Sequence, residues 1–111
     1  MAAPLAGHLA GMRAARDDGD AWAFTAADRS FHAEVVRAAG NTLLSGLYDG
    51  LRDRQQRMGV SLVRGSRERM DATVQQHAEL LAALGGDDRE HWLELVREHV
   101  RDAGRRLRSA R

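Results

Sequence analysis

The sequence predicts an all-α protein, an antiparallel helical bundle of about five helices. Apolar residues recur along the chain at the three- and four-residue spacing that places them on one face of a helix. No useful stretch shows the alternation of a half-buried β-strand. The single proline, Pro4, lies at the N-terminus, so no proline interrupts a helix further along the chain. The segments between the periodic stretches are short, which favours antiparallel neighbours.

Length and composition limit the class of protein. A chain of 111 residues can form one compact domain, and 43% hydrophobic with 30% charged residues is typical of a globular chain rather than a disordered one. Cysteine is absent, which excludes disulfides and thiolate metal sites. The net charge of +1 gives no preference for an anionic partner. No stretch approaches the roughly 18 apolar residues of a membrane span, and no signal-peptide core is evident, so a cytoplasmic protein is expected.

Two helices are expected in the first forty residues. The first covers residues 4–16 and ends before an acidic turn at 17–19. The second covers residues 24–41, with Asp20 available to cap its N-terminus and Gly40 to stop it. The apolar stripe expected on the second helix consists of Phe24, Ala27, Phe31, Val35 and Ala38.

A third helix is expected to begin after Asn41 and to run from Leu43 to Met58 or as far as Leu62. Glycines at 59 and 65 bracket a weak region at its end. Its exposed side is expected to carry the charged residues between 52 and 57. The stripe expected to face the core consists of Leu43, Leu44, Leu47, Tyr48, Leu51, Gln55 and Met58.

The last two expected helices each place a histidine within their apolar stripe. The fourth helix covers residues 67–84, with Ser66 as its cap, and its stripe contains His77. The fifth covers residues 88–108, after a Gly-Gly stop, and its stripe contains His99. An imidazole that faces a core is costly unless it has a partner, so both positions call for an explanation.

These two histidines are joined by two ionisable positions on the second helix. Asp28 and His32 are four residues apart there, which stacks them on one face beside or within the apolar stripe. In a bundle the stripes converge on one axis, so the four groups can meet. One carboxylate oxygen and three imidazole nitrogens suit a divalent ion such as Zn²⁺, Ni²⁺, Co²⁺, Mn²⁺ or Fe²⁺, with zinc, nickel or manganese favoured. The predicted metal ligands are Asp28, His32, His77 and His99.

Two alternatives stay open at this point. A buried histidine is more often a hydrogen-bonded core residue than a ligand, and Asp28 with His32 can form an i, i+4 pair of modest energy. A metal-free helical interaction module is therefore one alternative. A mononuclear metal-dependent enzyme is the other, although no buried carboxylate beyond Asp28 is evident to act as a general base. The sequence contains no H-E-x-x-H, no P-loop and no G-x-G-x-x-G.

Several short motifs, taken together, carry a resemblance to a known family. D-x-x-F-H is followed by A-A-G-N, then by H-x-x-L-L-x-A-L, an acidic turn and a last helix containing E-H-V. The pattern resembles the C-terminal effector-binding (FCD) domain of FadR-type GntR family transcription regulators, over about residues 5–108. The matching positions are Asp28, Phe31, His32, Ala38, Ala39, Gly40, Asn41, His77 through Leu84, Asp87, Glu98 and His99.

The resemblance implies a ligand-sensing domain and no enzymatic activity. Many members of that family hold a divalent metal through one Asp and three His, which correspond to the four ligands predicted above. A small carboxylate, such as an organic or sugar acid, completes the coordination there. Its binding alters the grip of a paired winged helix-turn-helix domain on DNA. The resemblance does not identify the effector-binding residues of this chain.

Two parts of the family pattern have no counterpart in this sequence. The winged-helix domain is missing, and so is the first effector-domain helix, which usually carries an arginine that helps to hold the effector. Residues 1–111 are therefore expected to form a single domain truncated at its N-terminus. The missing helix is expected to leave an apolar groove, which a second copy of the chain in a homodimer, or a swapped helix, would cover.

Overall fold

The structure is a computed structural model, and it describes residues 2–38, 42–84, 90–92, 94–95 and 97–98. Within those ranges it contains helices and short connections and no strand, so the all-α prediction is confirmed. Residues 90–92, 94–95 and 97–98 are helical, inside the fifth helix expected at 88–108. The numbered helices are α1 (Ala2–Asp18), α2 (Ala21–Ala38), α3 (Thr42–Gly50), α4 (Arg52–Val63) and α5 (Arg67–Leu84). None of the helices that the described residues form is long and apolar enough to cross a membrane.

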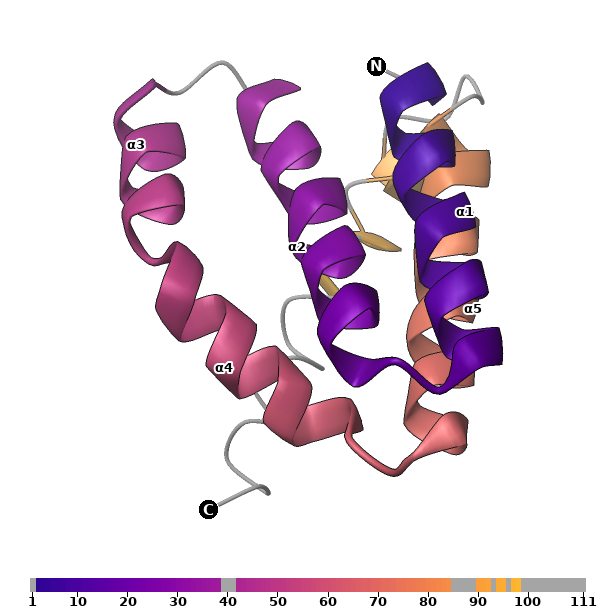
Figure 1. Ribbon diagram of the computed structural model, residues 1–111. Coiled ribbons are helices and arrows are strands. Elements are labelled where there is room, and N and C mark those ends of the chain that lie inside the picture. The colour runs from indigo at the N-terminus through magenta and orange to yellow at the C-terminus, as the bar shows by residue number, and fades with distance from the viewer. Residues whose placement is uncertain (1, 39–41, 85–89, 93, 96, 99–111) are drawn as a thin grey trace.

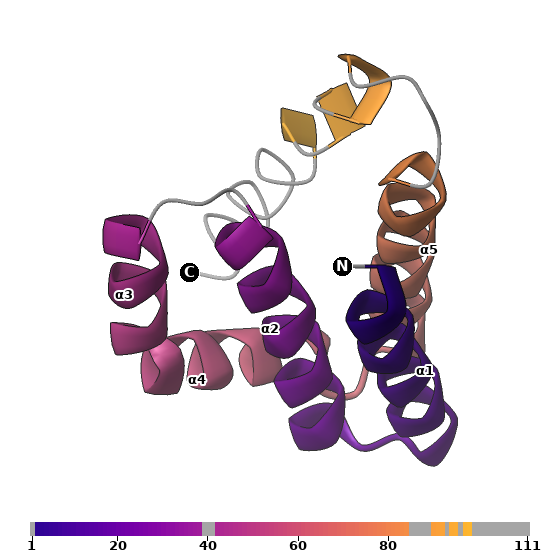
Figure 2. The same ribbon diagram turned by 90° about the horizontal axis from the view of Figure 1, so that it is seen from above.

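Helix α2 lies in the middle of the arrangement. It packs along α1 on one side and against α4 and α3 on the other, while α5 packs against α1 (Figures 1 and 2). The turn of Gly19 and Asp20 joins α1 directly to α2, so these two helices run antiparallel.

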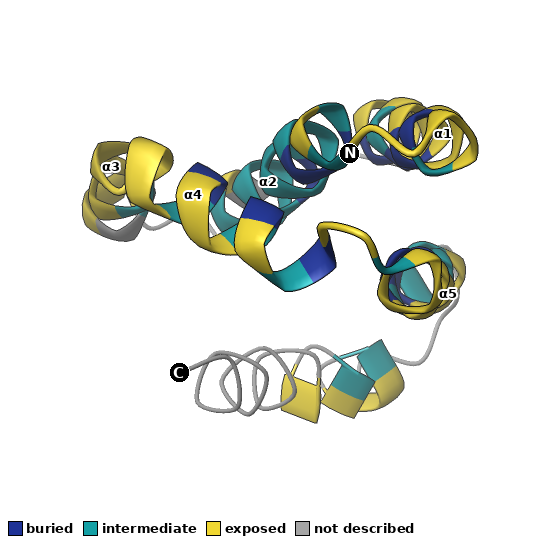
Figure 3. Cartoon of the chain, turned by 60° about the horizontal axis from the view of Figure 1, so that its bottom comes forward, coloured by how far each residue is buried: buried dark blue, intermediate teal, exposed yellow. Residues whose placement is uncertain are grey.

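The core consists mainly of apolar side chains from α1, α2 and α5. Phe24 and Phe31 of α2 are 1% and 0% exposed, and burying each contributes roughly 1.5–3 kcal/mol. Figure 3 shows buried positions on the sides of the helices that face one another. Two of its members, Phe24 and Phe31, belong to the apolar stripe expected on the second helix, and four more come from α1. Its other apolar members are Leu5, Leu9, Met12, Ala15, Val60, Val63, Met70, Val74 and Leu80.

The two expected N-caps upstream of α2 and α5 are both present. The Asp20 carboxylate accepts a hydrogen bond from the backbone N–H of Ala23 at 3.0 Å. The Ser66 hydroxyl accepts one from the N–H of Arg69 at 3.2 Å. Each cap follows a glycine with positive φ, Gly19 at 68° and Gly65 at 70°. Glycine suits both positions because residues with a side chain rarely adopt positive φ. The stop expected at Gly40 lies outside the described residues.

The single third helix expected from Leu43 to Met58 is wrong, because the chain bends at Leu51. There the backbone has φ −96° and ψ 11°, and the Leu51 N–H donates to the Tyr48 carbonyl at 3.2 Å. The side-chain amide of Gln55 donates to the same carbonyl at 3.2 Å, which satisfies an acceptor at the end of α3. Gly50, a weak helix former, directly precedes the bend.

The bend also makes the predicted burial of the third helix wrong. Leu43 and Leu47 are 83% and 61% exposed, and Leu51 and Met58 are exposed as well. The side chains that α4 buries are instead Gln56, Val60 and Val63. Because α4 starts in a new direction at Leu51, the stripe that continues α3 no longer faces α2.

Gly59, predicted to mark a weak region, lies inside α4 where this helix crosses α2. A Cβ placed at Gly59 would overlap the Cγ2 atom of Thr25, far inside van der Waals contact. Thr25 is 3% exposed, so it has little room to move. Glycine is therefore required here by the close approach of two helices and not by a turn.

Candidate metal centre

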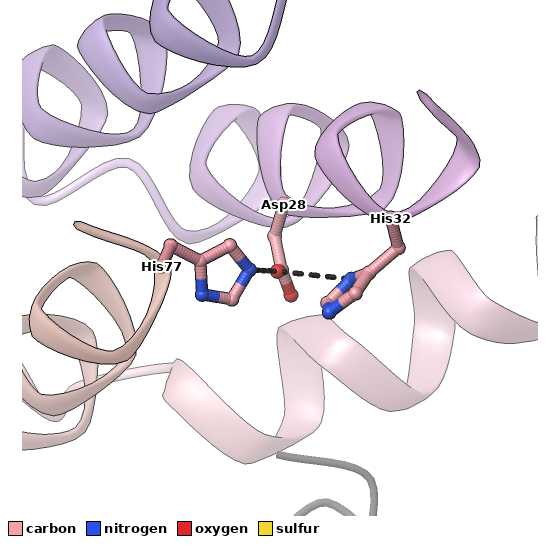
Figure 4. A group of neighbouring side chains, drawn as sticks. All are labelled: Asp28, His32 and His77. Atoms are coloured by element: carbon pink, nitrogen blue, oxygen red, sulfur yellow. Dashed lines mark ion pairs between the residues drawn. The ribbon is translucent and has the colours of Figure 1, made fainter. Parts of the chain in front are cut away.

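Three of the four predicted ligands lie together between α2 and α5. Asp28 and His32 come from α2, one turn apart, and His77 comes from the facing side of α5 (Figure 4). Each offers one ligand atom, and these atoms all lie within 4.8 Å of one another. The fourth predicted ligand, His99, lies outside the described residues.

Asp28 occupies the centre of this cluster. Its Oδ1 atom lies 2.6 Å from His77 Nε2 and 3.3 Å from His32 Nδ1. The two imidazole rings are 4.9 Å apart between centroids, at an interplanar angle of 74°. The His77 side chain is fully buried, whereas those of Asp28 and His32 are 25% and 29% exposed. The two α2 side chains of the cluster are therefore partly accessible to solvent.

A backbone carbonyl fixes the protonation pattern of His77. Its Nδ1 atom lies 2.8 Å from the carbonyl oxygen of Thr73, which can only accept a hydrogen bond, so Nδ1 carries a proton. In a neutral ring the lone pair is then on Nε2, the atom that faces Asp28. Metal-binding histidines commonly donate their other ring N–H to a carbonyl or carboxylate in this way.

The short Asp28–His77 distance requires a proton or a cation between the two atoms. A carboxylate oxygen and a bare imidazole nitrogen are both acceptors and would repel each other at 2.6 Å. Either a proton on Nε2 or a cation bound between the groups removes that repulsion. Both possibilities are consistent with the composition of the cluster.

Burial lowers the pKa of His32 below its ordinary value of 6.5. The negative charge of Asp28 opposes this shift, and His77 adds to it. His32 is consequently neutral at pH 7, which is the form of imidazole that binds metal ions.

Phe31 forms the apolar wall of the cluster. Its ring centroid lies 4.5 Å from that of His77 and 6.2 Å from that of His32, and the side chain is fully buried. An apolar wall excludes water and strengthens the electrostatic interactions of the three polar groups. The sequence placed Phe31 in the core stripe without relating it to the predicted ligands.

Two further residues of this environment were not singled out from the sequence. Thr73 supplies the carbonyl that orients His77, and its place four residues earlier in the same helix is the signal that could have identified it. Tyr48 of α3 was expected only as a stripe residue. Burial and the charge of Asp28 both raise the pKa of Tyr48, so its phenol stays a hydrogen-bond donor at neutral pH.

The residues present fit a borderline divalent cation. One carboxylate and two imidazoles are ligands that zinc, nickel and manganese accept, and the orienting carbonyl is in place. Such an ion requires at least one more ligand than the three residues provide.

Comparison with known proteins identifies the family. A family model of the FCD domain matches residues 2–102, almost the whole chain. Comparisons with curated proteins and with solved structures give no match.

Proposed function

The chain belongs to the FCD domain family, and from this premise we propose that it senses a small carboxylate through a bound divalent metal ion. FCD domains are the effector-binding domains of GntR-family regulators, so the chain is a regulatory domain. In the proposal Asp28, His32 and His77 hold the metal, with His99 as the fourth ligand. Zinc, nickel and manganese are the preferred ions.

One observation carries the metal proposal: His77 directs Nε2 at Asp28 from 2.6 Å while Thr73 holds its other nitrogen. The burial of this ring, the carbonyl that orients it and the carboxylate that it faces support the proposal that His77 is a metal ligand. The neutral state favoured for His32 and the apolar wall of Phe31 support the same proposal.

The metal would act as a Lewis-acid anchor for the effector's carboxylate. The chain's own residues would orient the effector: Phe31 keeps water away, and the Tyr48 phenol can donate a hydrogen bond to an oxygen of the ligand. The ligands come from α2 and α5, so occupancy would tie these helices together. It would thereby favour one arrangement of the bundle over another.

The proposed output is control of DNA binding, without catalysis. A winged helix-turn-helix domain outside residues 1–111 would contact DNA, and residues 1–111 would form one effector domain. A cytoplasmic location is part of the same proposal. For the homodimer, we propose that a second copy covers the outer side of α3, where Leu43 and Leu47 lie four residues apart and are both exposed.

A metal-free module remains the second candidate, and the same short contact favours it. If Nε2 carries a proton, His77 and Asp28 form a charge-assisted hydrogen bond that links α5 to α2 without any ion. In that case chelators would leave the stability of the protein unchanged.

Metal content decides between these candidates. We expect the untagged protein to bind close to one equivalent of Zn²⁺ or Ni²⁺, and both Asp28→Asn and His77→Ala to lose it, because each removes a ligand. His8→Ala is the matched control, since His8 lies near Glu34 and outside the cluster. Elemental analysis after metal loading and dialysis provides the measurement. Wild-type protein with less than about a tenth of an equivalent after loading would refute the metal centre.

Effector binding is tested by thermal shift with a panel of organic and sugar acids, with and without chelator. A true effector at a hundred times its Kd should stabilise the metal-loaded protein by about 2.7 kcal/mol. The shift should vanish in the chelated protein, because the anchor for the carboxylate is removed. A shift of equal size with and without metal would contradict the proposed mode of binding.

A further inference from the structure

A groove between α2 and α4 gathers positive charge that the metal centre does not use. It is open to solvent, has a volume of about 730 Å³ and is lined by Trp22, Arg29, Arg52, Gln56 and Arg57, among others. The metal centre instead joins α2 to α5. The groove and the centre are therefore separate features of the same helix.

The arginines of this groove lack acidic partners within the described part of the chain. Arg16, Arg37 and Arg67 form ion pairs with carboxylates, but Arg29, Arg52 and Arg57 form none. Asp53 is the only acidic side chain among the lining residues, so three guanidinium groups and one carboxylate leave a local charge of +2. A concentration of unpaired guanidinium groups in a concave site attracts an anion with several acceptor oxygens.

Gln56 forms the floor of the groove and is fixed there by two hydrogen bonds. It is 6% exposed, its amide donates to the Trp22 carbonyl at 3.0 Å, and its Oε1 accepts from Arg29 Nε at 3.4 Å. Only Nε of Arg29 is used in this way, so the terminal nitrogens of its guanidinium are available on a side chain that is already oriented. Ordering before binding reduces the entropy lost when a ligand arrives.

Trp22 gives the groove an aromatic surface. The residue is 63% exposed although it is the largest side chain type, and it lies in the lining beside the arginines. An exposed indole next to guanidinium groups can stack on a flat ring while the guanidiniums bind a phosphate.

We propose that the α2–α4 groove binds a small organic phosphate that carries a planar ring, of the nucleotide class. Arg29, Arg52 and Arg57 would hold the phosphate, and Trp22 would stack on the ring. A phosphate fits better than a carboxylate because it brings three acceptor oxygens and up to two negative charges to a site with several guanidinium groups. The site does not depend on the metal centre or on the proposed function.

Calorimetric titration of the full chain with adenosine monophosphate tests the proposal. The titration is run in chelator, so that the phosphate cannot bind through a metal ion. We expect saturable binding that weakens at least tenfold in Arg52→Gln/Arg57→Gln. Arg54→Gln/Arg64→Gln is the matched control, because it removes the same charge from exposed positions outside the groove lining and should change affinity less than twofold.

Two further measurements separate the contributions of the phosphate and of the planar ring to the affinity. Adenosine and inorganic phosphate should each bind at least tenfold more weakly than the monophosphate, since each lacks one half of the contacts. Trp22→Ala should weaken binding and Trp22→Phe should restore most of it, because an aromatic face is what stacks. Circular dichroism melts of all the variants check that the exposed substitutions leave the fold intact.

Three results would overturn the proposal. They are no saturable binding up to roughly 10 mM ligand, an equal loss in the two double variants, and tighter binding of a duplex oligonucleotide with the same dependence on Arg52 and Arg57. The last result would assign the groove to DNA. Because the metal is absent throughout, failure here leaves the metal proposal untouched, and failure of metal binding leaves this one untouched.

Discussion

Helices α2 and α3 each carry a regular apolar stripe, but the two stripes differ in how far they are buried. Phe24 and Phe31 of the α2 stripe are almost inaccessible, whereas Leu43 and Leu47 of α3 are among the most exposed apolar side chains described. Helix α2 lies between α1 and α4, while α3, within the described part of the chain, packs mainly against α2 and α4 (Figures 1 and 2). The difference shows that periodicity identifies the face of a helix that could be buried. Whether that face is buried depends on a partner helix.

The sharpest test of this comparison is truncation at one position on each stripe. Phe31→Ala should destabilise the protein by about 3–5 kcal/mol, because it empties a fully enclosed volume beside His77. Leu47→Ala should cost less than about 0.5 kcal/mol, because that side chain is already largely in water. Urea unfolding followed by circular dichroism measures both. Equal losses at low protein concentration would mean that α3 is packed as tightly as α2.

A second test compares one glycine in each region. Gly59→Ala should destabilise by about 1–3 kcal/mol, since the new methyl group overlaps Thr25 where α4 crosses α2. Gly46→Ala in α3 should instead stabilise by roughly 0.5–1 kcal/mol, because nothing lies near the new Cβ and alanine favours the helix.

The cause of the Gly59 effect is checked by a compensating change. Thr25→Ser removes Cγ2, the atom that the new methyl group meets, and should recover much of the loss in a Thr25→Ser/Gly59→Ala variant. If the two substitutions are simply additive, the crowding between α2 and α4 is not the reason for the glycine.

Substitutions at the N-termini of α2 and α4 should give a smaller difference in the free energy of unfolding. Asp20→Ala should destabilise by about 1 kcal/mol, because the Ala23 N–H loses its acceptor at the start of α2. Asp53→Ala, in the first turn of α4, should cost only a few tenths of a kcal/mol through the helix dipole, since α4 has no side-chain cap hydrogen bond to lose. Chemical unfolding of both variants provides the comparison, and a larger effect at Asp53 would reverse it.

The smallest expected change in the free energy of unfolding comes from a variant that tests the proposed dimer. Leu43→Ser/Leu47→Ser should change the unfolding free energy by less than about 0.5 kcal/mol while shifting the protein from dimer to monomer. Light scattering at micromolar concentration measures the mass. A wild-type protein that is monomeric under these conditions would show that no second copy covers the outer side of α3.

The sequence alone determined those features that depend on nearby residues. The apolar spacing located α1, α2 and α5, and Asp20 and Ser66 marked helix starts because a cap acts within three residues of its own position. The pairing of Asp28 with His32 on one face also followed from the helix period. These interactions are local, so the order of residues is sufficient to predict them.

Only the tertiary structure decided which of those faces meet. It bent the chain at Leu51 and left α3 exposed, and it required glycine at position 59 for contact with Thr25. It also brought His77, forty-nine positions after Asp28 in the sequence, to 2.6 Å from that carboxylate. The physical reason is that such contacts depend on how helices distant in sequence pack against one another. A repeating pattern within one helix carries no information about the position of another.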